Sequence, residues 1–461
     1  MANQRGDKST NANSIFRHEV SFQPTVSEKD RNWQAFIGVN SVTPSLKGTN
    51  LQGAYLKGAY LRKAELRKLD LREVCLSFAD LIEADLSEAC LTLANLTEAC
   101  LNLSNLRKAI LSQANLFKAN LVGADLNQAD LRRANFCKAN LVGASLEEAN
   151  LSGANLCGTD LSSTDLRGAN LKNAVYNLAT RCPEGFDMAK AGAYLIGPNM
   201  LLPQINLSGV DLSGTDLRGT DLRRANLRKT NLSNVNLVAA NLSGVNLSGA
   251  NLIGADLREV ILKKAVYTPW TQFSEDFDPV KSGAYLIAPD VCLIEVNLSD
   301  LDLCGADLRS ANLSRANLTG AEMRSVDLSQ AKLRKVQLEM AKLQDADLKE
   351  ADLTKANLKQ ANLSNADLRD VNLTKANLQG AILTGADLRG ADLTGVCLNQ
   401  ANLSNVDLRN ADLTRADLRG ANLSGTDLSQ VDCTGMILDV GSPIAIPHSD
   451  KEFAGHTLPR H

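Results

Sequence analysis

The side chains that most often perform acid–base chemistry or bind zinc lie at the two ends of this 461-residue sequence. The four histidines are His18, His448, His456 and His461. Histidine is the usual general base near neutral pH and the commonest zinc ligand. The body of the chain therefore lacks the side chain that most often serves either purpose. Serine and threonine are abundant there, but a hydroxyl without a partner base is not an activated nucleophile. The sequence therefore predicts a protein that is not an enzyme and holds neither a metal nor a cofactor.

A second candidate chemistry is an acidic and basic stripe in the C-terminal third. An aspartate recurs every twenty residues and is followed two positions later by Arg, Lys or Ser. The aspartates are Asp307, Asp327, Asp347, Asp367, Asp387, Asp407 and Asp427. Such a stripe could follow the phosphates of a nucleic acid, and its carboxylates could coordinate a metal. Each of its arginines shares a side of the coil with the aspartate two residues earlier, however, and the net charge of the chain is only −3. A self-neutralised, solvated face is the favoured interpretation, and a nucleic acid is not the expected partner.

Two cysteines are the remaining candidates for chemistry. Cys137 and Cys157 are twenty residues apart, whereas the ten cysteines as a whole show no C-x-x-C spacing. If twenty residues make one coil, the two Cα atoms lie about 5 Å apart, within disulfide range. A disulfide and two free thiols both stay open, and free thiols are favoured in a reducing compartment.

The distribution of apolar residues indicates where in the cell the protein is expected. No stretch approaches the roughly 20 apolar residues that cross a bilayer. The first thirty residues contain no apolar run of the kind that marks a secretory signal. We expect a cytoplasmic protein without a membrane span.

The elements that must position these side chains repeat every five residues. From Leu46 to Leu171 every fifth residue is leucine, except Phe136, and the residue two positions earlier is usually alanine. Asn or Asp usually precedes the leucine, so the consensus is A-(N/D)-L-x-x. A second run is centred on Leu207 to Leu262 and a third on Leu298 to Leu428. A period of five fits neither a helix nor a flat strand, and the recurrence at twenty residues indicates a coil with four sides.

Two matched inserts separate the three runs. They align without gaps at an offset of 91 residues, which pairs Tyr176 with Tyr267 and Tyr194 with Tyr285. Proline, which removes a backbone donor, occurs in the inserts, in the terminal regions and at Pro203, which precedes the first leucine centre of the second run. The predicted parts are an N-terminal arm (1–45), the first run (46–176), the first insert (177–201), the second run (202–267), the second insert (268–292), the third run (293–433) and a C-terminal tail (434–461). The arm and the tail could cap the open ends of a stacked structure.

The A-(N/D)-L-x-x runs resemble the pentapeptide-repeat family, and the inserts are similar to the G-F-D-P-type loops of some cyanobacterial-type members with several runs. The resemblance implies an all-β fold, a right-handed quadrilateral β-helix. About sixteen coils would stack at about 4.8 Å, interrupted by the two loop modules. The central leucine and the residue two before it would point inward, and the other three would face solvent. Cys182 and Ser274–Asp276 depart from the loop pattern, which leaves a shared role of the loops open.

Apolar side chains at outward positions are the candidate partner sites. On two neighbouring sides of the first run these are Phe78, Ile82, Leu93, Leu103, Phe117, Val122 and Val142. A contiguous exposed patch indicates an interaction site, whereas scattered single residues need no explanation, and both interpretations stay open. The insert aromatics that could contact a partner, or instead hold the loop onto the rod, are Phe186, Trp270, Phe273 and Phe277.

The predicted function is a structural scaffold that mediates protein–protein interaction, in a regulatory setting that the sequence does not define. The expected partner is a protein of unknown identity, and a homodimer stays open. The resemblance also implies an alternative, a DNA-mimicking protein that binds a type II topoisomerase such as gyrase. Family members of that kind have a strongly acidic face, which the nearly balanced charge of this chain disfavours.

Overall fold

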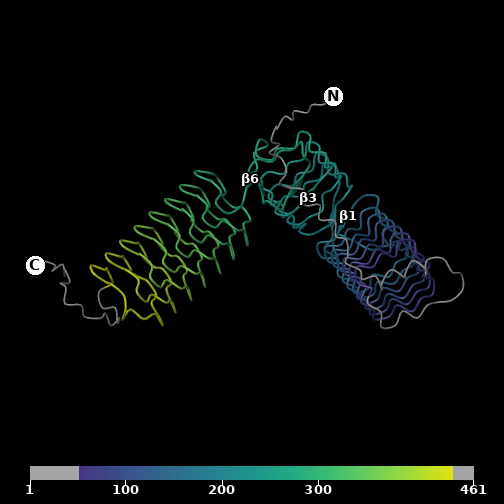
Figure 1. The fold of residues 1–461 in the computed structure, drawn as a ribbon, viewed down its shortest axis with the longest axis horizontal. Coiled ribbons are helices and arrows are strands. Elements are labelled where there is room, and N and C mark those ends of the chain that lie inside the picture. The colour runs from purple at the N-terminus through teal and green to yellow at the C-terminus, as the bar shows by residue number, and fades with distance from the viewer. Residues whose placement is uncertain (1–50, 440–461) are drawn as a thin grey trace, which may run out of the picture.

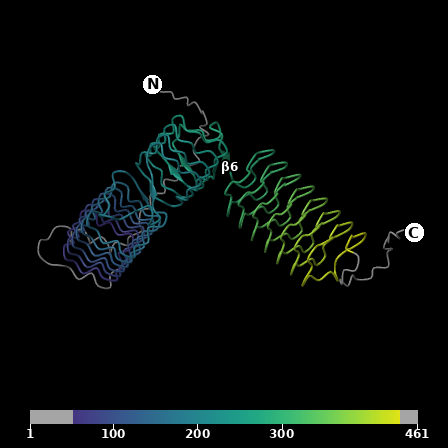
Figure 2. The ribbon, with the colours of Figure 1, turned by 180° about the vertical axis from the view of Figure 1, so that it is seen from behind.

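The computed structural model describes residues 51–439 as an elongated structure of stacked coils (Figure 1). An N-terminal part, coloured purple to teal, and a C-terminal part, coloured green to yellow, meet at an open angle beside strand β6 (Tyr285–Leu286) in both views (Figures 1 and 2). None of the residues described forms a helix that could cross a membrane. The predicted arm (1–45) lies outside the described residues, as does the tail beyond residue 439.

Parallel β-bridges link each coil to the next. Asn95 bridges Asn115, and Asp367 bridges Asp387, each twenty residues away. The amide nitrogen of Asn95 donates to the carbonyl oxygen of Val74 at 2.8 Å, and the amide of Leu76 donates to Asn95 at 2.7 Å. Such bridges occur at every fifth residue, so each twenty-residue coil has four sides, as the recurrence in the sequence predicts.

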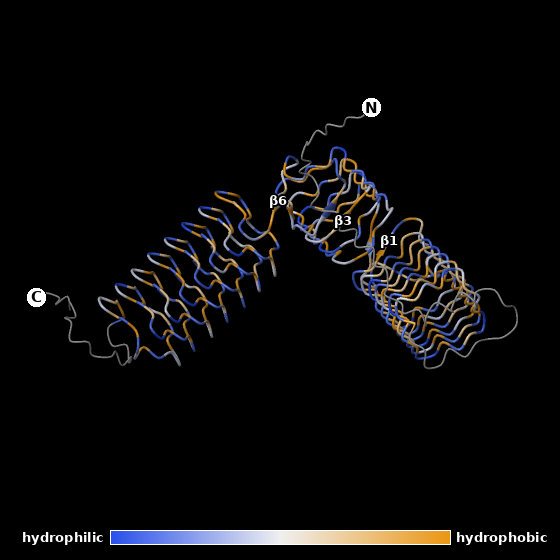
Figure 3. Cartoon of the chain, in the orientation of Figure 1, coloured by the Kyte–Doolittle hydropathy of each residue, from blue (hydrophilic) through white to orange (hydrophobic). Residues whose placement is uncertain are grey.

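The interior is a column of leucines and small residues. Leu363 and Ala361, one central leucine and the alanine two positions before it, are both fully buried. Where a threonine replaces that alanine, its hydroxyl is satisfied: Thr230 Oγ1 donates to the carbonyl oxygen of Leu207 at 2.8 Å. Hydrophobic and hydrophilic residues alternate along every coil (Figure 3). The central leucine and the residue two positions before it therefore point inward, which confirms what the family resemblance implies.

The corners explain why Asn or Asp precedes the leucine. Asp392 Oδ1 accepts a hydrogen bond from the backbone N–H of Thr394 at 2.9 Å, and Asn115 Oδ1 accepts one from Phe117 at 3.0 Å. This side-chain-to-backbone bond closes a tight turn, as short polar side chains commonly do. The second residue after the leucine has a positive φ, for example +59° at Lys355, and this conformation turns the chain onto the following side.

Regular strands occur only near the inserts within residues 51–439. They are β1 (Val175–Tyr176), β2 (Tyr194–Leu195), β3 (Asn251–Leu252), β4 (Val266–Tyr267), β5 (Gln272–Phe273) and β6 (Tyr285–Leu286). The pairs β1–β2, β3–β5 and β4–β6 are parallel. The first and last of these pairs occupy equivalent places in the two 91-residue units, so both inserts rejoin the ladder in the same way.

The second run begins beside the last coils of the first run. Asn155 Nδ2 donates to the carbonyl oxygen of Asp211 at 2.6 Å, and Asn135 Nδ2 donates to the carboxylate of the same residue at 2.9 Å. We call this contact the first junction. It leaves only 6% of Cys137 and 1% of Cys157 exposed, and both are free thiols. The expectation that every such position faces solvent is wrong at these two cysteines, because the second run covers them.

An equivalent contact, the second junction, joins the second and third runs. Asn246 Nδ2 donates to the carbonyl oxygen of Asp302 at 2.6 Å, which repeats the Asn155–Asp211 bond 91 residues later. Arg228 Nη1 donates to the carbonyl oxygen of Cys304, and Arg224 forms an ion pair with Asp300 at 3.1 Å. The second junction is therefore more polar than the first.

The first junction predicts a pattern of thiol reactivity. We expect Cys137 and Cys157 to resist alkylation by iodoacetamide in the native protein at neutral pH, whereas the exposed Cys292 reacts. Burial raises the pKa of both junction thiols, and the thiolate is the reactive form. Mass spectrometry after a brief labelling pulse measures the modified fraction at each cysteine.

Asn155→Ala should increase labelling of Cys157 because it removes the bond to Asp211. Asn170→Ala removes an exposed asparagine from the same run and serves as the control. Equal labelling of Cys157 and Cys292 in the unmodified protein would contradict the docked arrangement.

Candidate protein-binding surfaces

The seven apolar residues predicted as a partner site lie on the first run and are called here the first-run apolar surface: Phe78, Ile82, Leu93, Leu103, Phe117, Val122 and Val142. Phe78, Leu93 and Leu103 are 52%, 51% and 62% exposed. The other four are half-buried. The structure thus places three large apolar side chains in water near the beginning of the rod.

One side of the rod carries most of this surface. Ile82, Val122 and Val142 occupy the same outward position in different coils, with Asn102 between the first two. The side-chain Oδ1 of Asn102 is buried and has no hydrogen-bond partner. Leu103 lies at the adjoining corner and extends over Gly123, where its Cδ2 is 2.8 Å from the place a Cβ would take. Gly123 has a φ of +66°, so both its backbone and its space favour glycine.

Lysines border the two aromatic members of the surface. Lys57 Nζ lies 5.4 Å from the ring centroid of Phe78, within the range of a cation–π contact. Lys118 and Lys138 lie 5.3 and 5.8 Å from the ring of Phe117. Phe117 also contacts the apolar cluster that the second run shares with Cys137. Phe117 therefore belongs partly to the first junction, whereas Phe78 does not.

Three further exposed apolar residues of the first run, in the part from residue 51 onward, were not predicted. Tyr55, Tyr60 and Ile110 stand immediately before a central leucine, at the position that usually holds Asn or Asp. Tyr55 and Tyr60 bridge Cys75 and Asp80 on the two sides that carry the first-run apolar surface. Their departure from the consensus is the signal that could have identified them.

The insert aromatics divide into two groups. The rings of Phe273 and Phe277 stack at 5.4 Å, and Tyr267 meets Phe273 edge-on at 5.6 Å. Phe186 likewise packs against the core of the first run. These phenylalanines hold the inserts onto the rod. Trp270 is 83% exposed and projects from the second insert.

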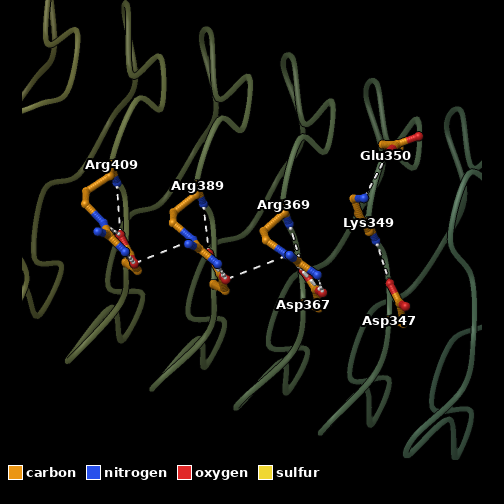
Figure 4. A network of polar contacts seen from close by, with 9 residues as sticks. Asp347, Lys349, Glu350, Asp367, Arg369, Arg389 and Arg409 are labelled. Carbon is orange, nitrogen blue, oxygen red and sulfur yellow. Dashed lines mark hydrogen bonds and ion pairs between the residues drawn. The ribbon is translucent and has the colours of Figure 1, made fainter.

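The predicted acidic and basic stripe forms a ladder of ion pairs along the third run (Figure 4). Arg369 pairs with Asp367 of its own coil at 2.5 Å and reaches Asp387 of the next coil at 3.8 Å. Arg389 pairs with Asp387 at 2.6 Å and reaches Asp407 at 3.7 Å. Each carboxylate in this part of the ladder faces a guanidinium, so the stripe is neutralised internally.

The ion pairs also set the protonation behaviour of the carboxyl groups. The side-chain hydrogen bonds from Arg369 and Arg409 lower the pKa of Asp367 and Asp407. On the opposite side of the coil, the bond from Arg419 lowers the pKa of Asp417 to about 2. A general acid near neutral pH needs a raised pKa, so these carboxylates are suited to ion pairing and not to proton transfer.

No group of three or more His, Cys, Asp or Glu side chains among residues 51–439 is arranged to hold a metal ion. The outward aspartates recur because each closes a corner. Their shared role is the backbone hydrogen bond already described for Asp392.

The four-sided ladder and the inward leucines define a β-solenoid. A family model described as pentapeptide repeats (8 copies) matches residues 45–77, 75–113, 114–153, 139–175, 205–244, 236–266, 292–330, 331–370, 361–400, 372–410 and 397–435. Together these stretches extend over well more than half of the chain, which belongs to the pentapeptide-repeat family. Membership implies a right-handed β-helix, and proteins of this family are generally structural or interaction proteins. No curated protein matches the chain.

Several solved structures are similar to parts of the chain. HetL, a pentapeptide repeat protein from the cyanobacterium Nostoc involved in heterocyst differentiation regulation, shares 32% identity over 52% of this chain and 90% of its own, with a TM-score of 0.24. Another pentapeptide repeat protein from Nostoc shares 36% identity over 22% of this chain and 84% of its own, with a TM-score of 0.22. QnrB1, a plasmid-mediated fluoroquinolone resistance protein, shares 18% identity over 53% and 94%, with a TM-score of 0.28. The likeness lies in the repeat, and the function is argued from the surface of this chain.

The lowered pKa values predict that acid weakens the third run. A carboxyl whose pKa is lower in the folded state than in the unfolded chain, about 3.9 for aspartate, stabilises the fold above that value. This contribution is lost as the pH falls towards about 2, the pKa of Asp417. We expect the melting temperature to fall between pH 5 and pH 2 (about the window set by these values), as followed by circular dichroism.

Arg419→Gln should lower the melting temperature at pH 7 by a few degrees at most and make the acid dependence shallower. The matched control is Arg415→Gln, because Arg415 has no carboxylate within 4.0 Å in the described part of the chain. A steeper acid dependence in Arg419→Gln would contradict the assignment.

Proposed function

We propose that the protein is a non-enzymatic scaffold, a rod of about sixteen coils, which binds a protein partner through the first-run apolar surface. A cytoplasmic location, a regulatory setting and a homodimer remain predictions. The observation that supports the proposal is the backbone conformation of three members of the surface.

Phe78, Leu93 and Leu103 all occupy left-handed corners, with φ of 61°, 61° and 56°. Most corners of the rod hold glycine or a long polar residue. Apart from these three, the apolar non-glycine residues with positive φ in the described range are Ala239 and Met340. A left-handed conformation costs a residue with a Cβ about 1–2 kcal/mol, which glycine avoids.

Exposure adds to this cost, because the three side chains gain little from burial. Neither backbone preference nor the hydrophobic effect therefore explains large apolar residues at these corners. Contact with a partner does explain them, since a contiguous exposed apolar patch is typical of an interaction site.

The border of the surface indicates the chemistry of the partner. Lys57 and Lys138 border the aromatic members and form no ion pair within residues 51–439, whereas Lys118 pairs with Glu98 at 3.1 Å. A matching partner presents apolar side chains at its centre and carboxylates at its rim, the usual anatomy of a protein interface. DNA mimicry requires a face of unpaired acidic groups, and along the ladder of the third run the aspartates from Asp367 to Asp407 are paired with arginine.

Replacing all three corner residues tests the proposal without damaging the rod. The variant Phe78→Gly, Leu93→Gly, Leu103→Gly should abolish partner binding and leave the free energy of unfolding within about 1 kcal/mol of the original or higher, because glycine relieves the left-handed strain. Proteins retained by the immobilised original rod but not by the variant are identified by mass spectrometry. Their affinity is then measured with purified components.

Met340→Gly is the matched control, since Met340 is 52% exposed at an equivalent corner of the third run. It should leave binding unchanged. If the triple variant folds normally and still binds every partner of the original protein with equal affinity, the first-run apolar surface is not the binding site.

A further inference from the structure

A cavity of about 440 Å³ lies at the second junction. It is bounded by the second run, the second insert and the beginning of the third run. Its lining includes Arg228, Lys229, Trp270, Ile287, Pro289 and Leu303. Most cavities that bind small molecules have volumes of about 300–1,000 Å³ and mainly apolar walls with a few polar groups. The cavity at the second junction has both properties.

The walls combine a buried apolar floor with an exposed aromatic ring. Ile287 and Leu303 are each 2% exposed and belong to the apolar core of the third run. Trp270 also lines the cavity, yet 83% of it is exposed, so the indole lies at the opening. An indole with free faces is well suited to cover a flat apolar ligand.

Two cations without a carboxylate partner also face the cavity. Arg228 is half-buried, and its Nη1 donates to the carbonyl oxygen of Cys304. Neither Arg228 nor Lys229 forms an ion pair within residues 51–439, although most arginines there pair with Asp or Glu. The partly buried guanidinium therefore retains donors for an incoming anion, and its planar fork matches a carboxylate.

Two aspartates line the same cavity, and their bonds determine the local charge. Asp307 pairs with Arg309 at 2.8 Å. Asp302 Oδ1 accepts a hydrogen bond from the backbone N–H of Cys304 at 3.1 Å. With Asp307 neutralised by an arginine outside the lining, Arg228 and Lys229 outweigh the single remaining carboxylate.

The first junction provides an internal comparison. Its cavity, about 270 Å³, is smaller, and most of its lining residues are the equivalents, 91 positions earlier, of residues that line the cavity at the second junction. Cys137 stands at the place of Arg228, and Ala179 at the place of Trp270. The guanidinium and the indole are therefore specific to the second unit, although the Asn–Asp contact that joins the runs is the same in both.

We infer that the cavity at the second junction binds a small organic anion with a flat apolar body and one carboxylate group. The carboxylate lies on Arg228, and the apolar body lies between the buried floor and Trp270. This site is separate from the proposed protein-binding surface on the first run, so the two proposals can fail independently.

Calorimetric titration with 1-naphthoate tests the inference on the full-length protein. We expect saturable binding with one site per chain, and binding at least tenfold weaker for the neutral analogue 1-naphthamide, which lacks the charge-assisted bond to Arg228. In a Trp33→Phe background Trp270 is the sole tryptophan, and its indole N–H resonance should shift during the titration. Absence of saturable binding, or equal affinity for the amide, would overturn the inference.

Two variants locate the site. Trp270→Ala removes an exposed side chain and should weaken 1-naphthoate binding by about tenfold, the effect expected for loss of an aromatic contact. Arg228→Gln should reduce the affinity for 1-naphthoate to that for 1-naphthamide. The controls are Leu178→Ala in the first insert and Arg258→Gln, which removes an exposed arginine of the same run. Unchanged affinity in Trp270→Ala would place the ligand elsewhere and contradict the inference, even if Arg228→Gln disturbs the junction.

Discussion

The whole structure depends on turning a corner every five residues while each coil keeps its hydrogen bonds to the next. The central leucine fills the interior, the residue two before it must be small enough to share that space, and Asn or Asp closes the turn. The second residue after the leucine adopts a left-handed conformation within the turn. Four of the five positions are thus restricted by the fold, and the outward position after the leucine, such as Val122 or Arg369, is the freest to vary.

Much of this arrangement could be predicted from the sequence because it is local and repeated. The spacing of leucines predicts the interior, and the twenty-residue recurrence of Asp367, Asp387 and Asp407 predicts the neutral ladder that the structure contains. These inferences need only the period and the chemistry of the side chains. They do not depend on the path that the chain takes through the inserts.

The two junctions could not be predicted from the sequence, because contacts between runs are not local. Whether an outward residue faces water depends on where the next run begins, and the irregular backbone of the insert decides that. Cys157 and Phe117 have the same repeat position as many exposed residues, yet the second run covers one and partly covers the other. Periodicity carries no information about such a contact between runs. The 91-residue offset predicted two matched inserts, but not that each would bring one run into contact with the next.

The two junctions also show how a repeated structure acquires distinct sites. The bonds from Asn155 to Asp211 and from Asn246 to Asp302 preserve one geometry in both units. Around that constant contact, residues that do not hold the ladder together differ between the two units, as Cys137 and Arg228 illustrate. The same reasoning applies to Leu103, which occupies a corner where the backbone favours glycine. In a fold this repetitive, a side chain that neither fills the interior nor suits its corner has no structural explanation, and its position is where binding is most reasonably sought.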